Sequence, residues 1–546
     1  MNEQLHHLSI DLETYSEVSI GKAGSYRYIL DPSFEILLFA YSLDGMPVEV
    51  IDVASGQIIP LWLKNALKNP LYIKHAYNAA FEWFALSKYL GWLPPDQWRD
   101  TMLHALYCGY PASLDAAGKA MGLPEDKKKL TTGKALIRYF CVPCKPSNAN
   151  GNRTRNLPKH DPDKWKLFKE YNGQDVVTEM EIDHRLSAFP VPAFVQKQWE
   201  TDLQMNARGV AADMELVRGA LVIGAIVKSR LMTEARQLSG LDNPNSIRQL
   251  AQWLTDATDS DAEITSVTKE TVATMLKQPQ PANVQRMLEI RQELGKTSTK
   301  KYDALETCIA DDGRVRGLLQ FYGANRTGRW AGRLVQVQNL PRTYTHPLPP
   351  ARQLVKDRNI DGLRMMYGSI NDTLSQLIRT AFVATPGNVL IDADFSAIEA
   401  RVISWLAGQE WRLEVFRTHG KIYEASASQM FHVPIEKIKK GNPEYALRQR
   451  GKVAELALGY QGGVSAMRRM DVGHNLDDLS DDEVKGIVDR WRETNSMIRD
   501  LWNIVDSAAI TVITNGGAQT IRSETTDAII TLACELDVIT GTRYMT

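Results

Sequence analysis

The sequence has little cysteine, no excess of positive charge and no long apolar run. Five cysteines in 546 residues cannot build a disulfide framework, so a reducing cytoplasm is the expected compartment. Since no apolar run reaches the roughly 18 residues that cross a bilayer, no membrane association is expected. The net charge of −1 argues against a generally basic nucleic-acid binder and allows only local basic tracks. With 44% hydrophobic and 24% charged residues, the composition is that of a globular protein.

Residues 1–190 have the pattern of a mixed α/β domain. Apolar runs predict strands at 7–12, 35–43, 47–53 and 71–75, and helical periodicity predicts helices at 79–90, 101–107 and 163–186. Because the strands come first and the helices follow, we expect a sheet covered by helices. Pro190-Val191-Pro192 marks the end of this domain.

The rest of the chain is mostly helical. Helical periodicity covers residues 193–309, and a β-like segment interrupted by glycine follows at 314–342. An apolar strand predicted at 389–394 leads into further helices, and residues 516–546 alternate like strands.

Three pairs of polar residues in the α/β domain are spaced so that both members share one face. Asp11 and Glu13 alternate at the end of the first strand, where two carboxylates can share a divalent cation. Asn78 and Glu82 are four residues apart in a predicted helix, and so are Tyr171 and Asp175. Each pair taken alone also fits an ordinary structural role, as a solvated strand end, a helix cap or polar surface.

In this order, the three pairs resemble the three exonuclease motifs of the DnaQ-like 3′–5′ proofreading nucleases, over about residues 5–188. The resemblance implies an RNase H-like fold and phosphodiester hydrolysis with two Mg²⁺ or Mn²⁺ ions. The implied metal ligands are Asp11, Glu13, Glu82 and Asp175. The resemblance also implies that Tyr171 orients the attacking water and that Asn78 contacts DNA. Glu82 departs from the family pattern, which usually has Asp at this position.

Residues 314–342 contain six arginines and no acidic residue, with aromatic side chains interleaved. Arginine guanidinium groups suit phosphate oxygens, so this stretch is a candidate track for a nucleic-acid backbone, although a solvated basic face would look the same. Within it, Thr327-Gly328-Arg329 and Gln338-Asn339-Leu340-Pro341 resemble the primer-template-binding segment of family-A DNA polymerases. The implied DNA contacts are Thr327, Arg329, Arg333, Gln338 and Asn339.

Residues 389–401 form an apolar run that ends in acid just before a helical pattern begins. An acid that closes a buried strand is costly unless it is paired or binds a metal, which singles out Asp394. Ser396 and Glu399 have the spacing of a capping box, which by itself would explain Glu399. The segment resembles motif A of family-A polymerases. That resemblance implies that Asp394 binds both catalytic metals, with the Phe395 carbonyl as a further ligand, and that Glu399 is the steric gate against a ribose 2′-OH.

Arg448, Lys452, Leu456 and Tyr460 recur at every fourth position and would form one stripe on a helix. An ordinary amphipathic helix explains any two of these residues better than it explains all four. The stripe resembles motif B, the fingers helix of family-A polymerases. Arg448 and Lys452 would then hold the phosphates of the incoming nucleotide, and Tyr460 would lie near the templating base. Leu456 stands where the family commonly has Phe or Tyr.

The resemblance spans nearly the whole chain and is closest to family-A DNA polymerases of phage and prophage type. It implies an α/β exonuclease domain at 1–190, a helical thumb at 191–312, part of the palm at 313–400, fingers at 401–515 and the start of a β-rich palm segment at 516–546. The implied partners are primer-template DNA, 3′ ends of single strands and deoxynucleoside triphosphates, with two Mg²⁺ or Mn²⁺ ions per active site. A monomer in the host cytoplasm is expected.

Motif C of the family, a late His-Asp-Glu turn, has no counterpart in the sequence. Glu535 and Asp537 form an acid pair near the end, but they lack the histidine. We therefore expect a chain cut short before motif C, with doubtful polymerase activity. Two other readings remain open: a 3′–5′ exonuclease that carries an inactive polymerase remnant, and a non-catalytic DNA-binding protein.

Overall fold

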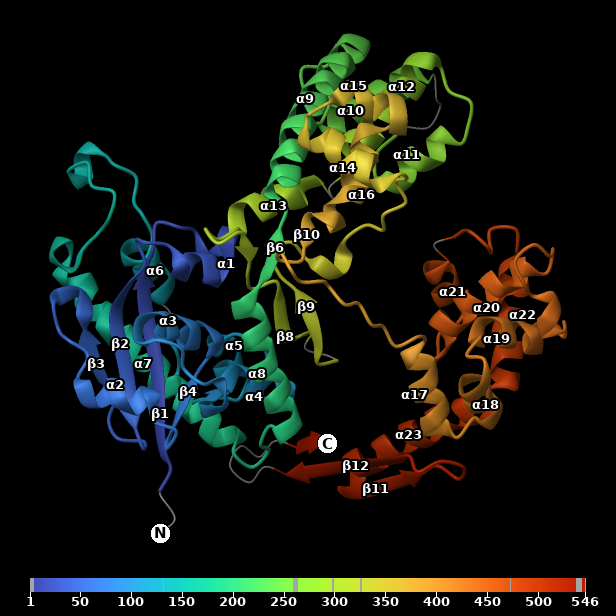
Figure 1. Cartoon of the computed structure of the whole chain (residues 1–546). Coiled ribbons are helices and arrows are strands. Elements are labelled where there is room, and N and C mark those ends of the chain that lie inside the picture. The colour runs from blue at the N-terminus through green and yellow to red at the C-terminus, as the bar shows by residue number, and fades with distance from the viewer. Residues whose placement is uncertain are drawn as a thin grey trace. The chain divides into compact units, whose positions relative to one another are not determined.

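The computed structural model of the chain describes residues 4–130, 132–258, 264–296, 299–324, 327–471, 473–536 and 543–545. Arg326 of the arginine-rich stretch and Asp537 of the late acid pair lie outside these residues. The chain divides into two compact units, an N-terminal unit (Met1–Leu390) and a C-terminal unit (Ile391–Thr546), which are shown in Figure 1. Among the described helices, none is long and apolar enough to cross a membrane.

The N-terminal unit begins with a five-stranded mixed sheet in the order β3-β2-β1-β4-β5. Its strands are β1 (His6–Tyr15), β2 (Glu35–Leu43), β3 (Glu49–Asp52), β4 (Tyr72–Ala76) and β5 (Trp98–Asp100). The pairs β1–β2 and β2–β3 are antiparallel, whereas β1–β4 and β4–β5 are parallel. The first four strands match the predicted ones, and β5, at three residues, is too short to show a period.

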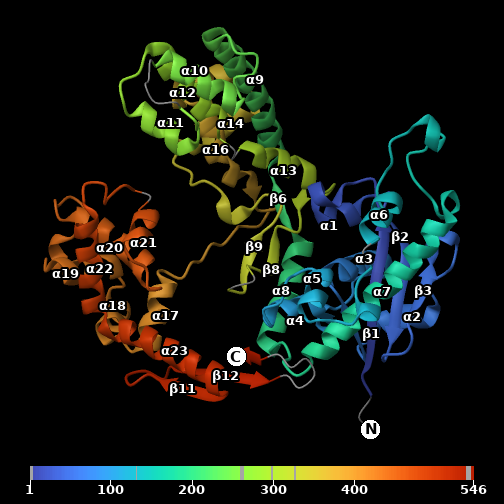
Figure 2. The same ribbon diagram turned by 180° about the vertical axis from the view of Figure 1, so that it is seen from behind.

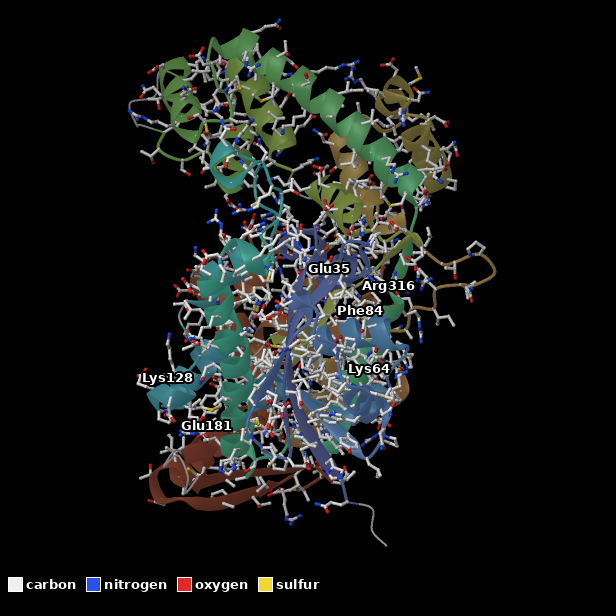
Figure 3. All side chains as sticks on the ribbon, turned by 90° about the vertical axis from the view of Figure 1, so that its left-hand side faces the viewer. Glu35, Lys64, Phe84, Lys128, Glu181 and Arg316 are labelled. Carbon is white, nitrogen blue, oxygen red and sulfur yellow. The ribbon has the colours of Figure 1, made fainter. Side chains whose placement is uncertain are left out.

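Helices cover both faces of this sheet, as the sequence predicts. They are α1 (Ile20–Leu30), α2 (Leu61–Lys68), α3 (Ala80–Leu90), α4 (Thr101–Tyr107), α5 (Leu114–Ala120), α6 (Gly133–Phe140), α7 (Pro162–Leu186) and α8 (Ala193–Arg208). In Figure 3, the long helix α7 lies on one side of the strands, together with Glu181 and Lys128, and Lys64 of α2 and Phe84 of α3 lie on the other side.

The alternation of side chains along β1 determines which of them lie on each face of the sheet. Leu8, Ile10 and Leu12 pack into an apolar core with α2 and α3, whereas Tyr15 packs into a second core with α6 and α7. Because side chains alternate along a strand, Asp11 and Glu13 share the α7 face with Tyr15. The carboxylates of β1 are thus directed at α7 by the same pattern that buries the other face.

A helical bundle follows the sheet domain in the same unit. Its helices are α9 (Met214–Ser239), α10 (Ile247–Ala257), α11 (Lys269–Leu276), α12 (Ala282–Leu294), α13 (Lys300–Cys308), α14 (Leu348–Lys356), α15 (Ile360–Tyr367) and α16 (Ile370–Leu377). Figures 1 and 2 show α9 to α12 gathered with α14 to α16. The crossing of α9 and α14 is close because Gly219 has no side chain: a Cβ there would lie 2.2 Å from the Val355 carbonyl oxygen.

Short strands connect the bundle to the sheet domain. One small sheet has the order β10-β6-β7, with β6 (Val210–Ala212), β7 (Arg314–Val315) and β10 (Phe382–Val383). A separate hairpin pairs β8 (Leu319–Ala324) with β9 (Arg329–Gly332). The β-like character predicted for 314–342 corresponds to β7, β8 and β9.

The C-terminal unit is mainly helical and ends in a three-stranded antiparallel sheet in the order β11-β12-β13. Its elements are α17 (Ile398–Ala407), α18 (Glu410–Thr418), α19 (Ile422–Phe431), α20 (Tyr445–Leu458), α21 (Val464–Met470), α22 (Asp481–Thr494), α23 (Ser496–Asn515), β11 (Gly517–Arg522), β12 (Ile529–Leu536) and β13 (Arg543–Met545). An apolar core holds α19 to α22 together.

A buried ion pair lies in the core of the C-terminal unit. Arg412 of α18 donates to both carboxylate oxygens of Glu455 on α20, and their side chains are only 1% and 2% exposed. Arg412 also donates to Ser404 Oγ at 2.8 Å and to Asn495 Oδ1 at 2.9 Å. Trp491 Nε1 donates to Glu455 at 3.0 Å. Helices α17, α18, α20 and α22 are therefore joined through one satisfied polar network.

The prediction of a strand at 389–394 is wrong, because these residues have no regular secondary structure. Val389 is 79% exposed and Ile391 is 88% exposed. Among the described residues, no strand pairs with this segment, so its backbone groups have no ladder to join. Local apolar character suffices to suggest a strand, but a strand needs a neighbour.

Candidate functional site

Strand β1 and helix α7 bring three carboxylates together in the N-terminal unit. Asp11 and Glu13 come from β1 and Asp175 comes from α7, and one ligand oxygen of each lies within 4.8 Å of the others. The motif resemblance predicts that these three acids share a metal site. Carboxylate oxygens are the ligands that Mg²⁺ and Mn²⁺ prefer, so the cluster is a candidate divalent-metal site.

Glu82 approaches the same cluster from α3. It is buried, and the neighbouring charges of Asp11 and Glu13 act on it. Glu13, Glu82 and Asn78 also line one pocket of about 370 Å³. The fourth predicted acid therefore adjoins the other three, although it is Glu where the related motif usually has Asp.

Asn78 does not cap helix α3, contrary to its ordinary structural role. The residue before the helix is Ala79, and Asn78 lies in the left-handed region with a φ of 69°. Its backbone N–H donates to Asp100 Oδ1 at 2.9 Å, and the same oxygen caps α4 through Met102 N. Asp100 therefore fixes the turn that leaves the Asn78 side chain exposed at the pocket.

Several buried polar atoms of the cluster lack a partner. Among the described residues, Asp175 Oδ1 and Glu82 Oε2 are buried with no hydrogen bond. An unpaired buried carboxylate oxygen is costly, and a bound cation would satisfy it. These two oxygens, together with the three converging carboxylates, fit a divalent metal.

Three other oxygens of the cluster have protein donors that the sequence does not suggest. Asn172 Nδ2 donates to Asp11 Oδ2 at 2.6 Å, and Cys141 Sγ lies 3.7 Å from Glu13 Oε2. The ammonium of Lys129 pairs with Asp175 Oδ2. Asn172 is adjacent to Tyr171, so its position on α7 is the one signal that could have found it. Lys129 and Cys141 are distant in sequence from their partners and carry no such signal.

Tyr171 is held between Lys129 and the start of α6. The Lys129 Nζ atom lies 4.7 Å from the centre of the tyrosine ring. On the other side, Gly133 allows the close approach, because a Cβ there would lie 2.0 Å from a ring carbon. The ring is thereby fixed one turn of α7 before Asp175.

Burial, together with mutual repulsion, raises the pKa values of the carboxylates. Burial, and then repulsion from Asp175, raises the pKa of Asp11 to about 7, while Lys129 acts in the opposite direction. Burial, and then repulsion from Asp11, raises the pKa of Glu13 and that of Glu82. Burial also raises the pKa of Asp175, against the opposing effect of Lys129. The single charge of Lys129 does not balance these acids, and a bound cation would supply further positive charge.

We expect the metal-free protein to lose stability as the pH rises from about 4 to about 7. Burial raises the pKa of folded Asp11 from 3.8 to about 7, so between these values the folded state holds a proton that the unfolded state has released, and this stabilisation is gone once the pH has passed through about 7. In EDTA, the melting temperature of the wild type should fall more steeply with rising pH than that of Asp11→Asn. Buried His75, whose pKa burial lowers to about 4, affects both proteins alike. Parallel curves for the two proteins would contradict the raised pKa.

The motif A residues of the C-terminal unit are exposed. Asp394 and Glu399 are exposed, and Phe395 is 79% exposed. The burial argument from the sequence is therefore wrong for Asp394. The predicted capping box is also wrong: α17 begins at Ile398 after Ala397, and no side chain caps it. Glu399 lies in the first turn of α17, so a capping role does not explain it.

The predicted stripe lies on helix α20. Arg448 and Lys452 are half-buried, whereas Leu456 is 43% exposed and Tyr460, just beyond the helix, is 69% exposed. Arg448 donates to Glu424 Oε1 at 2.7 Å, an ion pair that the sequence does not predict. Glu455 of the buried network lies two turns after Arg448, on the same side of α20, so Leu456 and Tyr460 are the exposed members of the stripe.

The arginine-rich stretch divides into two groups. Arg314 donates to the carbonyls of Arg208 and Gly209, and Arg316 pairs with Asp312 at 2.6 Å. These two arginines are engaged within the fold, so the candidate track predicted over 314–342 does not include all six arginines. Arg329, Arg333 and Arg342 are exposed.

The exposed arginines lie close to the other predicted DNA contacts. Thr327 is exposed in the turn of the β8–β9 hairpin, and Gln338 and Asn339 are exposed in a short 3₁₀ turn (Val337–Asn339). Gln338 lies against Gly332, the last residue of β9, where a Cβ would be 2.2 Å from its Oε1. The hairpin and the turn therefore present these polar side chains from one region of the N-terminal unit.

Comparisons with known proteins identify relatives of the chain. The family described as DNA polymerase family A matches residues 226–522. The DNA polymerase of Bacillus phage SP02 is 50% identical over 507 residues, which is 93% of this chain and 77% of that protein. The thermostable DNA polymerase I of Thermus aquaticus is 29% identical over 272 residues, 48% of this chain and 28% of that protein.

The fold also has a relative among solved structures. The polymerase domain of Pol1 from M. smegmatis, in complex with DNA primer-template and dNTP, matches with a TM-score of 0.56 and 18% identity. The match covers 96% of this chain and 77% of that one. Together with the family match and the phage relative, these findings show that the chain belongs to DNA polymerase family A, a family of DNA-directed DNA polymerases.

Proposed function

We propose that residues 1–190 are an RNase H-like 3′–5′ exonuclease that proofreads for the polymerase. The observation that carries this proposal is the convergence of Asp11, Glu13 and Asp175 within 4.8 Å on a mixed sheet, with Glu82 beside them. The pocket lined by Glu13, Glu82 and Asn78 gives the 3′ end of a single strand a place beside the carboxylates.

The four acids would hold the cations, and the remaining residues would position the substrate. When bound, Mg²⁺ or Mn²⁺ supplies activation of a water and stabilisation of the leaving 3′ oxygen. Tyr171, fixed by Gly133 and Lys129, would orient that water. The exposed Asn78 would contact the terminal nucleotide.

We further propose the polymerase roles of the remaining residues. Asp394 and the Phe395 carbonyl would bind the catalytic metals, and Glu399 would exclude a ribose 2′-OH. Arg448, Lys452, Leu456 and Tyr460 would bind the incoming nucleotide. The exposure of Leu456, Tyr460 and Asp394 is consistent with these roles. Residues 191–312 would form the thumb, 313–400 and 516–546 would contribute to the palm, and 401–515 would form the fingers.

The exonuclease proposal is tested with end-labelled single-stranded DNA. With Mg²⁺, a 5′-labelled strand should shorten one nucleotide at a time, and a 3′ label should be released at once as a mononucleotide. EDTA should stop both reactions. Internal cuts, or release of a 5′ label first, would reject the assignment.

We expect the exposed arginines to govern the salt dependence of DNA binding. Each phosphate contact contributes about −0.9 to the slope of log affinity against log salt on duplex DNA. Arg329→Ala and Arg333→Ala should each flatten the slope by about this amount, equally for all DNA sequences. Fluorescence anisotropy between low and high salt measures the slope. Arg314→Ala is the control, because Arg314 is bonded to carbonyls and should leave the slope unchanged.

A further inference from the structure

Lys129 is a cation already present at the acid cluster, and none of the roles above uses it for the reaction. Its ammonium pairs with Asp175 Oδ2, and its charge acts on Asp11 and Glu13 as well. The Lys129 side chain is 25% exposed, whereas that of Asp175 is 5% exposed. The lysine therefore reaches in from the surface to a buried carboxylate.

The segment that carries Lys129 is anchored on one side of the lysine. Gln174 of α7 donates to the Asp126 carbonyl at 2.9 Å, and Lys128 pairs with Glu125 at 2.6 Å. Lys129 also lies over the Tyr171 ring, so its charge has two attractive neighbours, an anion and an aromatic face. These contacts place the ammonium at the cluster. The hydrogen bond of Lys129 goes to Asp175, so the oxygens of Asp11 and Glu13 stay available to a metal ion.

A metal ion and Lys129 compete for the same carboxylate, that of Asp175. A divalent cation shared by Asp11, Glu13 and Asp175 needs an oxygen from each, and Lys129 occupies Asp175 Oδ2 while Asp175 Oδ1 has no partner. A fixed positive charge within a few ångströms of a bound dication repels it strongly in a partly buried site. The ion pair must therefore loosen when the dication enters.

We propose that Lys129 is a built-in counter-cation of the acid cluster: it holds Asp175 and Tyr171 in place when no divalent ion is bound, and it lowers the affinity for the ion that replaces it. This inference rests on the metal-binding part of the proposed exonuclease function. Lys129 is a positioning residue in this scheme. It makes occupancy of the site sensitive to the concentration of free divalent ion.

The test measures Mn²⁺ binding by electron paramagnetic resonance or calorimetry, in full-length chains that also carry Asp394→Asn to remove the proposed polymerase ligand. Lys129→Met keeps the length of the side chain and removes its charge. It should bind Mn²⁺ at least about tenfold more tightly, because the competing charge is gone. In EDTA it should unfold at a lower temperature than the parent, and Mn²⁺ should raise its melting temperature by more.

Two further variants control for charge and for position. Lys129→Arg keeps the positive charge and should bind Mn²⁺ as the parent does. Lys128→Met removes a neighbouring charge that pairs with Glu125 at the outer edge of the unit, where Figure 3 labels it, and should also leave Mn²⁺ binding unchanged. If Lys129→Met does not fold, the less drastic Lys129→Gln takes its place, with the same expected direction.

The outcomes separate this inference from the proposed function. Unchanged or weaker Mn²⁺ binding in Lys129→Met overturns the counter-cation role, even if the chain degrades DNA. Tighter binding in Lys129→Met and equally in Lys128→Met would show a general effect of surface charge and would also overturn it. Tighter binding confined to Lys129→Met supports the role, and it does so even if the wild type fails to cleave single strands.

Discussion

Asp11→Asn combined with Glu13→Gln is expected to lower the rate of 3′-terminal hydrolysis by about 10³-fold or more. The double variant removes two of the three carboxylates that converge within 4.8 Å, so the divalent ions lose their principal ligands. The substitutions keep the size of both side chains. Since they also remove repulsion among buried acids, the variant should not unfold earlier than the wild type in EDTA. Release of a 3′ label with Mg²⁺ measures the rate, and thermal unfolding measures the stability.

The control for this experiment is Asp115→Asn. Asp115 is exposed on α5, where it pairs with Lys119 at 2.7 Å. The Asp115→Asn variant should therefore hydrolyse DNA at the wild-type rate. Undiminished hydrolysis by the Asp11/Glu13 variant would show that the nuclease activity, if present, resides elsewhere. Loss of activity together with loss of folding would mean that the acids have a structural role instead.

Arg412→Met is expected to destabilise the C-terminal unit by about 3–5 kcal/mol. The substitution leaves the Glu455 carboxylate buried without its guanidinium partner, and it also removes the bonds to Ser404 and Asn495. Urea unfolding followed by tryptophan fluorescence should report the loss, because Trp491 donates to the same carboxylate. A change below about 1 kcal/mol would contradict a closed network.

Two further variants serve as controls for the Arg412→Met prediction. Arg417→Met breaks an exposed pair with Glu410 on the same helix and should cost at most about 1 kcal/mol. The double variant Arg412→Met with Glu455→Met should cost less than the two single changes added together, because no charge is then left unpaired. Additive losses would show that the two side chains act independently.

The sequence predicts those parts of the fold whose pattern is local and long. Strand β2 is predicted at its observed bounds because it is a nearly continuous apolar run, and α7 is predicted to within one residue over 25 residues. The shared face of Asp11 and Glu13 follows from strand alternation alone. The meeting of these acids with Asp175 follows from the motif resemblance, since the residues are more than 160 positions apart.

Other features depend on contacts that local patterns do not carry. Lys129 reaches Asp175 across 46 positions, and the conformation of Asn78 is set by Asp100, 22 positions away. The prediction of a strand at 389–394 is wrong for a related reason: strand pairing depends on a second segment, which the local sequence does not reveal. Arg314 and Arg316 had the composition of a phosphate track, yet carbonyls and Asp312 engage them.

The alternation of β1 also protects the molecule against misfolding. Leu8, Ile10 and Leu12 face one core, and Asp11 and Glu13 face the other side of the same strand. A slip of one position in the pairing with β2 would send every side chain to the opposite face. It would drive two carboxylates against Trp83 and its apolar neighbours and leave three large aliphatic side chains among the remaining acids. No small adjustment could repair such an arrangement. The acids of β1 thus help to specify the strand register, and variants that neutralise them should mispair more often during folding even where their native state is as stable as before.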